Sequence, residues 1–286
     1  MSESGQVREG SDAGSGAAVP TGIPYPSSRS SWFAVAVLMV IYIFSFVDRT
    51  ILNLLVEPIK ADLEITDLQM SYLMGLSFAI FYTLFGLPIG RLADRVNRKG
   101  IIAVGLFIWT IATAGCGLVR HYWQFLLLRV GVGVGEAALS PSAYSLITDM
   151  FPREKLGRAL SVYSMGIFIG AGIATGVGGG VGAWAERRGP MDLGPLGTVF
   201  PWQVAFLVIG LVGLTPMFLL LLVKEPVRRG AKIIKDAAGK ETVAAIPMGE
   251  VARYIMKNWK TFFCHHMGFA ILSFSSYGVG AWGRPL

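Results

Sequence analysis

The sequence predicts an all-α membrane protein with six transmembrane helices, arranged as a three-plus-three inverted repeat, and the start of a seventh. Hydrophobic residues make up 53% of the 286-residue chain and charged residues only 15%. A soluble domain of this size could not bury so much apolar surface. Apolar stretches long enough to cross a ~30 Å bilayer core recur along the chain. Lysine and arginine gather in alternate connecting segments, a pattern that indicates membrane topology.

The chain divides into four predicted regions. Residues 1–31 are rich in Gly, Ser and Pro, which predicts a disordered cytoplasmic tail without a cleavable signal peptide. Residues 32–223 predict the six-helix bundle. Residues 224–260 are polar and basic and predict a cytoplasmic linker, with either a membrane-surface helix or a solvated connector near its end. Residues 261–286 predict the truncated start of a second bundle. The spans are expected at residues 32–56, 68–89, 101–119, 122–147, 160–184 and 204–223, and the seventh at 261–282.

The basic residues predict the orientation in the membrane. A cytoplasmic N-terminus places 18 of the 25 lysines and arginines on the cytoplasmic side. The net charge of +7 therefore reflects topology, and we expect the lipid bilayer, not a nucleic acid, as the partner of this charge. We expect a multi-pass integral protein of the plasma (inner) membrane.

Four charged residues lie deep inside the predicted spans: Asp48, Arg49, Arg129 and Glu136. A charge at mid-membrane costs roughly 2.5–3.5 kcal/mol and is a functional hypothesis by default. Arg129 and Glu136 are about two helical turns apart and share one helix face. Since the first span runs outward and the fourth inward, all four charges fall at one level and sum to zero. The sequence therefore predicts a mutually compensated cluster between the first and fourth spans.

Glycines on two spans predict close helix packing. Gly131, Gly133 and Gly135 separate the two charges of the fourth span. Their spacing imitates a dinucleotide-binding fingerprint, but no strand precedes them. The fifth span carries glycines at small-residue spacing, among them Gly166 and Gly170, which favours a packing face in lipid.

The sequence predicts no metal centre, cofactor or enzyme activity. Cys116 and Cys264 lie in apolar spans without a CxxC motif. The adjacent His265 and His266 point to different helix faces, and His121 is remote, so a metal pair is not expected. An intramembrane aspartyl protease would need two acids sharing one proton. Here each acid has an arginine beside it or two turns away, which favours ionisation of both.

The loop after the second span resembles the signature of the major facilitator superfamily, roughly G-x-x-x-D-R/K-x-G-R-R/K. The matching residues are Gly90, Asp94, Arg95, Arg98 and Lys99. Asn97 stands where the family usually has glycine, and asparagine tolerates the left-handed conformation that glycine provides. In the family this loop holds the two halves together in the outward-open state. The resemblance therefore implies a gating role for these five residues, whereas a plain topological anchor is the alternative.

The fourth span is similar to the family motif R-x-x-x-G-x-G-x-A through Arg129, Gly133, Gly135 and Ala137. The fifth span loosely resembles the family's antiporter motif, but Ala171 stands where a proline is expected. Antiport is therefore not inferred.

The charged pair Asp48-Arg49, together with Glu136, looks most like the Spinster branch, whose members move lysolipid or sphingoid-phosphate molecules. The organic-anion:cation symporter branch has a similar first-helix pair and stays an alternative. The resemblance covers residues 33–282, the N-terminal half of a twelve-helix fold. It implies a secondary active transporter, proton-coupled, for an amphiphilic or anionic organic solute, with a missing C-terminal half as a partner. A truncated, non-transporting fragment is the further alternative.

The charge cluster suggests a mechanism. Burial favours the neutral form of a carboxyl group, and a nearby guanidinium favours the ionised form. Our hypothesis is that proton occupancy of Asp48 and Glu136 biases inward against outward states. Arg49 or Arg129 then pairs alternately with these acids or with an anionic substrate. The alternative is that the four charges only fasten the first span to the fourth.

Overall fold

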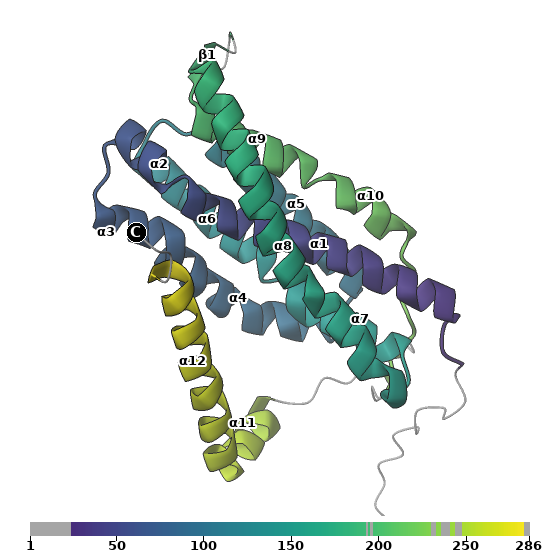
Figure 1. Ribbon diagram of the computed structural model, residues 1–286. Helices are drawn as coiled ribbons and strands as arrows, with labels where there is room; N and C mark the ends of the chain where they lie inside the picture. The colour runs from purple at the N-terminus through teal and green to yellow at the C-terminus, as the bar shows by residue number, and fades with distance from the viewer. Residues whose placement is uncertain are drawn as a thin grey trace, which may run out of the picture. The chain divides into compact units, whose positions relative to one another are not determined.

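The computed structural model describes residues 24–192, 194, 197–229, 233–235, 241–243 and 248–282 (Figure 1). They fall into two compact units, one within residues 18–231 and one within residues 232–286. Most of the predicted N-terminal tail, residues 1–23, lies outside the described residues.

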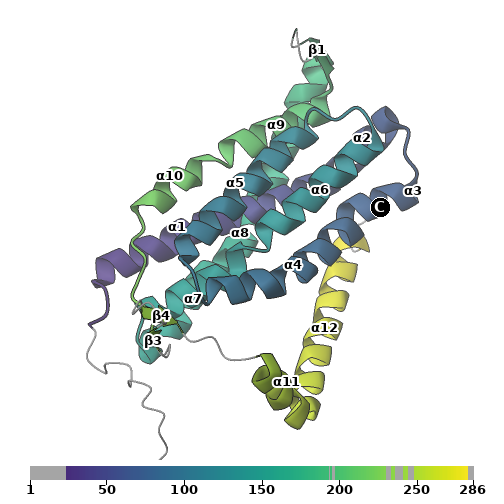
Figure 2. The same cartoon turned by 180° about the vertical axis from the view of Figure 1, so that it is seen from behind.

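The first unit is a bundle of helices (Figures 1 and 2). In chain order its helices are α1 (Ser28–Leu54), α2 (Val56–Leu63), α3 (Asp67–Ser71), the π-helix η1 (Tyr72–Leu76), α4 (Ser77–Ala93), α5 (Arg98–Cys116), α6 (Tyr122–Glu136), α7 (Leu139–Met150), α8 (Arg153–Arg188), α9 (Pro201–Val212) and α10 (Thr215–Leu222). A short antiparallel pair, β1 (Met191–Asp192) and β2 (Thr198–Val199), joins α8 to α9.

The second unit contains an antiparallel strand pair and two helices. Strands β3 (Ile233–Lys235) and β4 (Glu241–Val243) pair with each other. They are followed by α11 (Met248–Lys257) and α12 (Trp259–Trp282). The sequence analysis expected no strands in this linker. Val251, Tyr254 and Ile255, whose helical spacing suggested a surface helix, lie within α11, whereas Trp259, which continued that spacing, is the first residue of α12.

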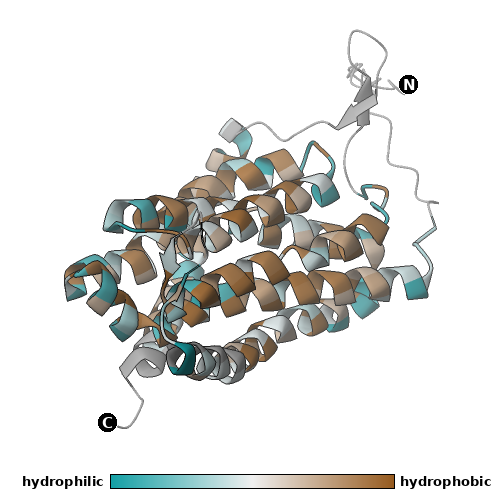
Figure 3. Cartoon of the chain, turned by 90° about the horizontal axis from the view of Figure 1, so that it is seen from above, coloured by the Kyte–Doolittle hydropathy of each residue, from teal (hydrophilic) through white to brown (hydrophobic). Residues whose placement is uncertain are grey.

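Six helices of the described residues are long and apolar enough to cross a membrane, as predicted. These spans one to six are Ser28–Leu54, Asp67–Ala93, Arg98–Cys116, Tyr122–Met150, Arg153–Gly176 and Pro201–Leu222. Large apolar side chains such as Leu87, Phe168 and Phe218 are at least 70% exposed. Figure 3 shows hydrophobic residues along the bundle helices and hydrophilic ones toward their ends. Lipid, rather than water, is the solvent that suits such a surface. The helix α12 is not among the six, so a seventh span stays a prediction.

The packing of the spans has the pattern of an inverted repeat. Span one packs against spans five and six, span four against spans two and three, and span three also against span six. If span one is exchanged with span four, two with five and three with six, the same set of packed pairs is obtained. Such a relation between two three-helix groups is expected of an inverted repeat.

Two spans are interrupted where the sequence analysis expected continuous helices. Span four breaks at Ala137 and Ala138, and span six breaks after Val212. In each case a proline follows four residues later, Pro141 or Pro216, and lacks the N–H group that would bond the carbonyl at the break. The Thr215 hydroxyl donates to the freed Val212 carbonyl at 2.8 Å instead.

Several helix boundaries also differ from the sequence prediction. Residues 28–31, expected in the tail, form the first turn of α1, where the Ser27 hydroxyl accepts a hydrogen bond from the Ser30 N–H group at 3.4 Å. The helix α8 begins at Arg153, directly after Pro152, and so includes residues of the expected loop. Proline is well tolerated at a helix start, where its missing N–H group has no intrahelical partner. The expected loop after span one contains α2.

The buried apolar side chains form two clusters along the bundle axis. One contains Leu38 and Trp109, and the other contains Phe125 and Trp202. On α1, α5 and α6, the residues between the two clusters include Ser45, Thr113 and Arg129. The polar groups described below therefore lie where the two apolar clusters meet.

The approach of α8 to α1 depends on Gly170. A Cβ atom at this position would lie 2.8 Å from the Ile43 carbonyl oxygen and 2.7 Å from the Phe46 Cβ atom. Gly172, two residues later, has no neighbour within 4 Å of its would-be Cβ atom. The predicted packing face of span five therefore includes Gly170 but not Gly172.

We predict that Gly170→Ala lowers the free energy of unfolding by about 1–3 kcal/mol, because it forces α1 and α8 apart. Thermal unfolding of the purified protein in detergent measures this change. The matched control, Gly172→Ala, should keep or slightly raise stability, since alanine favours helix. Equal effects of the two substitutions would contradict the close approach.

Candidate functional site

The four intramembrane charges lie between α1 and α6. Asp48 and Arg49 are neighbours on α1, so their side chains point about 100° apart and meet different partners. Arg129 lies in the middle of α6, and Glu136 is its last residue. The structure brings the four residues together as two separate ion pairs.

The first pair joins Asp48 to Arg129. An Oδ1 to Nη1 distance of 3.7 Å makes it an ion pair without a direct hydrogen bond. The Asp48 Oδ2 atom accepts a hydrogen bond of 2.6 Å from the Thr113 hydroxyl on α5. Both charged side chains are at most 2% exposed. This pair is closed to solvent.

The second pair joins Arg49 to Glu136 at shorter range. The Glu136 Oε2 atom accepts from the Arg49 Nε atom at 2.7 Å and lies 2.6 Å from an Arg49 Nη atom. The Ser45 hydroxyl donates to the same oxygen at 2.7 Å. The Glu136 side chain is fully buried, whereas 24% of the Arg49 side chain is exposed. Arg49 is therefore the most exposed of the four charges.

Aromatic rings surround the Arg49 guanidinium. Its centre lies 4.5 Å from the Phe78 ring centroid, 5.1 Å from that of Tyr82 and 5.2 Å from that of Phe46. Each distance is within cation–π range. The Phe78 ring also lies 5.9 Å from the Arg129 guanidinium. Span two therefore covers both arginines with one aromatic ring.

Glu136 is positioned by a close approach of α6 to α5. A Cβ atom on Gly135 would lie 2.7 Å from the Gly105 carbonyl oxygen. This agrees with the predicted packing role of the span-four glycines. The helix then breaks, so Glu136 stands at a helix C-terminus, where the helix dipole disfavours a negative charge. Arg49 supplies the compensating positive charge.

Several polar atoms of the cluster make no hydrogen bond within the described residues. They are Asp48 Oδ1, Arg129 Nε and Nη1, and Glu136 Oε1. Leaving a buried polar atom unpaired costs about 1–3 kcal/mol, and more for charged groups. Within the described residues the cluster therefore has both acceptor and donor atoms without a hydrogen-bond partner.

The predicted gating motif connects α4 to α5. Gly90 lies in the last turn of α4, and Asp94 and Arg95 follow it with exposed side chains. Asn97 is the N-cap of α5, and its Oδ1 atom accepts from the Gly100 N–H group at 2.8 Å. Its φ of −60° is not left-handed. Asn97 therefore caps a helix, and the left-handed conformation suggested in the sequence analysis was wrong.

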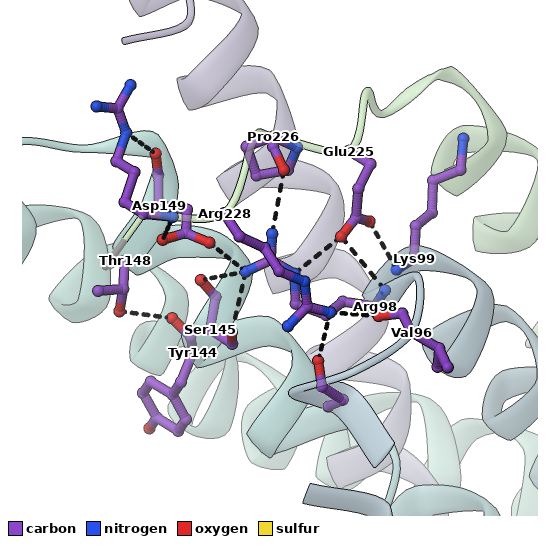
Figure 4. A network of polar contacts seen from close by, with 12 residues as sticks. Val96, Arg98, Lys99, Tyr144, Ser145, Thr148, Asp149, Glu225, Pro226 and Arg228 are labelled. Carbon is purple, nitrogen blue, oxygen red and sulfur yellow. Dashed lines mark hydrogen bonds and ion pairs between the residues drawn. The ribbon is translucent and has the colours of Figure 1, made fainter. Parts of the chain in front are cut away.

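Arg98 is fully buried at the centre of a polar network (Figure 4). Its guanidinium forms ion pairs with Asp149 of α7 and with Glu225, the latter at 2.8 Å. It also donates to the Ser145 carbonyl at 3.1 Å and to the Pro226 carbonyl at 3.2 Å. Arg98 thereby connects spans three and four to the segment that follows span six.

Lys99 and Arg228 extend this network. The Lys99 ammonium donates to the Leu221 and Val223 carbonyls at 3.0 and 2.9 Å. The Arg228 guanidinium donates to the carbonyls of Ala93, at 2.7 Å, and Val96. Burial, followed by the nearby charge of Arg98, lowers the pKa of Arg228. The carboxylates of the network offset this concentration of positive charge.

Arg229 ties the N-terminal segment to the same network. Its backbone N–H group donates to the Asp149 carboxylate at 3.1 Å, and its side chain donates to the Pro24 carbonyl at 2.8 Å. The Tyr25 ring lies 3.6 Å below its guanidinium. Residues preceding α1 therefore contact the segment that follows span six.

Sequence reasoning identified the charges within spans but missed their neutral and loop partners. Ser45 lies one helical turn before Arg49, which was a usable signal. Thr113 gave none, because threonine is ordinary in an apolar span. Asp149 and Glu225 were assigned to loops, although an acid directly after an apolar span is a candidate partner for the basic loop.

Fold and site together define a class: a multi-pass α-helical membrane protein with compensated charges inside its bundle. The sequence model of the Major Facilitator Superfamily matches residues 38–283. The chain belongs to this superfamily, as the loop and fourth-span motifs indicated, and corresponds to its N-terminal half.

Similar proteins include members of the Spinster branch, which confirms the predicted resemblance. Protein spinster homolog 1 of Xenopus tropicalis is 30% identical over 280 residues, which are 97% of this chain and 49% of that protein. An MFS-type efflux pump of Mycolicibacterium smegmatis is 32% identical over 214 residues, 74% of this chain and 46% of the pump. The chain spans about half the length of these relatives. Such relatives are transporters, not enzymes.

A solved structure supports the same assignment. The crystal structure of a bacterial homologue of the human lysosomal transporter Spinster, inward-facing and unoccupied, has 35% sequence identity and a TM-score of 0.64. The match covers 71% of this chain and 45% of that one. The all-α membrane fold predicted from the sequence is thereby confirmed.

We predict that Asp149→Asn lowers the free energy of unfolding by about 2–4 kcal/mol, because it leaves Arg98 with less compensating charge in a buried site. Chemical or thermal unfolding in detergent measures the effect. Asp94→Asn is the matched control, since the Asp94 side chain is exposed and makes no hydrogen bond or ion pair within the described residues. It should change stability by no more than about 0.5 kcal/mol. Similar losses in both variants would contradict the central place of Asp149.

Proposed function

We propose that this chain forms the N-terminal half of a secondary active transporter that carries an anionic or amphiphilic organic solute together with protons. The observation that carries the proposal is the pair of crossed ion pairs between spans one and four, Asp48 with Arg129 and Arg49 with Glu136. Buried charges in a membrane protein commonly belong to ion or substrate pathways.

The geometry favours a working cluster over a purely structural one. Asp48 and Arg129 are 3.7 Å apart, and several atoms of Asp48, Arg129 and Glu136 make no hydrogen bond within the described residues. A cluster that only held the helices together would be more stable with these hydrogen bonds formed, since a half-satisfied buried network is costly. A cluster that exchanges partners needs such spare capacity in each of its states.

We assign the two pairs different roles. Protonation of Glu136 removes the charge that holds Arg49, which is partly exposed. The freed guanidinium then binds an anionic group of the solute, with the Phe78 and Tyr82 rings beside the solute's apolar part. Asp48 and Arg129, which are closed to solvent, adjust to the change in charge next to them. Release of the proton restores the Arg49–Glu136 pair and expels the solute.

A second six-span half is the proposed partner. Spans two and five are the least buried. Only 11% and 28% of the residues in their most apolar stretches are buried within the protein, against 44–56% for the other four spans. Under the exchange of the two three-span groups, these two spans correspond to each other. Their exposed faces suit a pseudo-symmetric half that packs on both and closes the solute site between the halves.

We propose the orientation that the sequence predicts, with the N-terminus in the cytoplasm. The network around Arg98 and the starts of α1, α5 and α8 lie at the end of the bundle that carries most loop lysines and arginines. The positive-inside rule places that end in the cytoplasm. We propose the plasma membrane as the location.

An organic-anion:cation symporter is the second candidate. A probable L-galactonate transporter of Escherichia coli is 25% identical over 198 residues, 68% of this chain and 40% of that protein. Galactonate is a carboxylate, and Arg49 offers the bidentate geometry that carboxylates favour. The two candidates differ in the apolar part of the solute.

Substitution of Glu136 tests proton coupling. In a chimera whose first six spans and the segments flanking them are residues 24–229 of this chain, and whose second half comes from the bacterial Spinster homologue, Glu136→Gln should reduce uptake driven by a pH gradient by about tenfold or more. The glutamine keeps the size and the acceptor for Arg49 but cannot cycle a proton. Solute uptake into proteoliposomes, with and without the gradient, measures the effect.

The exposed Glu154→Gln is the charge-matched control and should leave uptake unchanged. Solute exchange without a gradient should persist in Glu136→Gln, because it requires no net proton movement. Unchanged gradient-driven uptake removes Glu136 from the coupling. Parallel loss of exchange, uptake and thermal stability identifies a fastening role instead.

We propose that the motif from Gly90 to Lys99 controls gating, and Asp94 tests it. Asp94 is exposed, so it can pair with the second half in one state of the cycle. Asp94→Ala in the same chimera should lower the maximal transport rate about threefold or more with little change in the solute KM, because a conformational step is slowed. Initial uptake rates over a range of solute concentrations separate the two parameters. Full cycling of this variant, with Glu154→Ala as control, contradicts the assignment.

A further inference from the structure

A cavity of about 400 Å³ lies at the end of the bundle where span one ends and span six begins. The helix α2 contributes Pro58, Ala61 and Asp62, which are three and four residues apart and so share one helix face. Leu55, Phe200 and Trp202 complete the lining used below. None of these residues belongs to the charge cluster or the gating motif. The volume falls within the range of small-molecule sites, about 300–1,000 Å³.

The lining is apolar except for one carboxylate and one indole N–H group. Trp202 Nε1 donates to Asp62 Oδ2 at 3.0 Å. The Asp62 side chain makes no other hydrogen bond or ion pair within the described residues. The nearby Lys60 is held by Asp67 at 2.6 Å and lies 3.8 Å from Glu57. No basic side chain of the described residues therefore neutralises Asp62.

The electrostatic surroundings select a cation. The carboxylate of Asp62 stands beside the first turn of α9, whose N-terminal end stabilises a negative charge. Asp62 thus already supplies the anion that this helix end favours, and a second anion would be repelled. Glu64, the C-cap residue of α2, adds to the negative potential. A positively charged group beside Asp62 satisfies the carboxylate in full.

The position of the cavity selects an amphiphile. Leu55 directly follows the last residue of α1, and Trp202 lies in the first turn of α9, so the lining is level with the ends of two membrane spans. At this depth one side of a site meets acyl chains and the other meets headgroups and water. A molecule with an apolar body and a charged head matches both environments.

We propose that this cavity binds a single-chain cationic amphiphile from the membrane, an alkylammonium compound whose chain packs against Leu55, Phe200 and Trp202 while its ammonium group pairs with Asp62. The binding is independent of the proposed transport. The cavity lies at an end of the bundle, away from the charges between spans one and four, and uses none of them.

Photo-crosslinking of the full chain in maltoside micelles tests the proposal. The probe is an alkylbenzophenone with a trimethylammonium head, and the comparison probes carry an alcohol or a carboxylate on the same chain. Mass spectrometry locates the label. We expect saturable labelling of the segments 55–62 and 200–206 by the ammonium probe, displaced by dodecyltrimethylammonium.

Asp62→Asn removes the charge but retains an acceptor for the Trp202 indole. It should raise the concentration of ammonium probe for half-maximal labelling about five- to tenfold and leave the alcohol probe unaffected. The matched control is Glu57→Gln, on the same helix but outside the lining, which should have little effect. Equal labelling by all three probes, no labelling of these segments, or equal effects of the two variants overturns the proposal.

A second variant serves if Asp62→Asn does not fold. Ala61→Leu fills the cavity from an exposed position without changing a charge or the Asp62–Trp202 hydrogen bond. It should abolish labelling by the ammonium probe while thermal stability is retained. Retained labelling in a folded Ala61→Leu protein also overturns the proposal.

Discussion

The two crossed ion pairs between α1 and α6 constrain how spans one and four lie against each other. A shift of either helix by one residue turns its side chains by about 100° and separates Asp48 from Arg129 and Arg49 from Glu136. Four unpaired charges would then face apolar surroundings, a state far more costly than the loss of any single apolar contact. Because the pairs lie where the two apolar clusters meet, the packing of α1, α5 and α6 on either side depends on them.

The sequence predicted the members of this site because intramembrane charges are rare and need partners. Hydropathy located Asp48, Arg49, Arg129 and Glu136, and helix direction placed them at one level. Their pairing depends on how each helix is rotated about its axis, which the hydropathy of the spans does not determine. Thr113 could not be predicted, since its role follows from the contact of α5 with α1 and not from its own neighbours in sequence.

The fold was predictable in its spans and less so in their ends and interruptions. A 20-residue apolar stretch dictates a helix in lipid because every backbone group must be bonded within it. The breaks in spans four and six follow from Pro141 and Pro216, but proline is tolerated in many membrane helices, so its presence alone did not predict them. Asn97 illustrates a related difficulty: asparagine suits both a left-handed residue and an N-cap, and only the start of α5 decides between them.

The two buried arginines Arg98 and Arg129 differ in a way that bears on their roles. Arg98 is fully buried and uses its guanidinium in ion pairs with Asp149 and Glu225 and in hydrogen bonds to backbone carbonyls. Arg129 is equally buried but has one ion pair of 3.7 Å and two nitrogen atoms without hydrogen bonds within the described residues. The same chain can therefore satisfy a buried guanidinium when it serves to hold segments together. We infer that the remaining partners of Arg129 belong to another state of the protein, in which the proposed protonation or anion binding rearranges the charges around it.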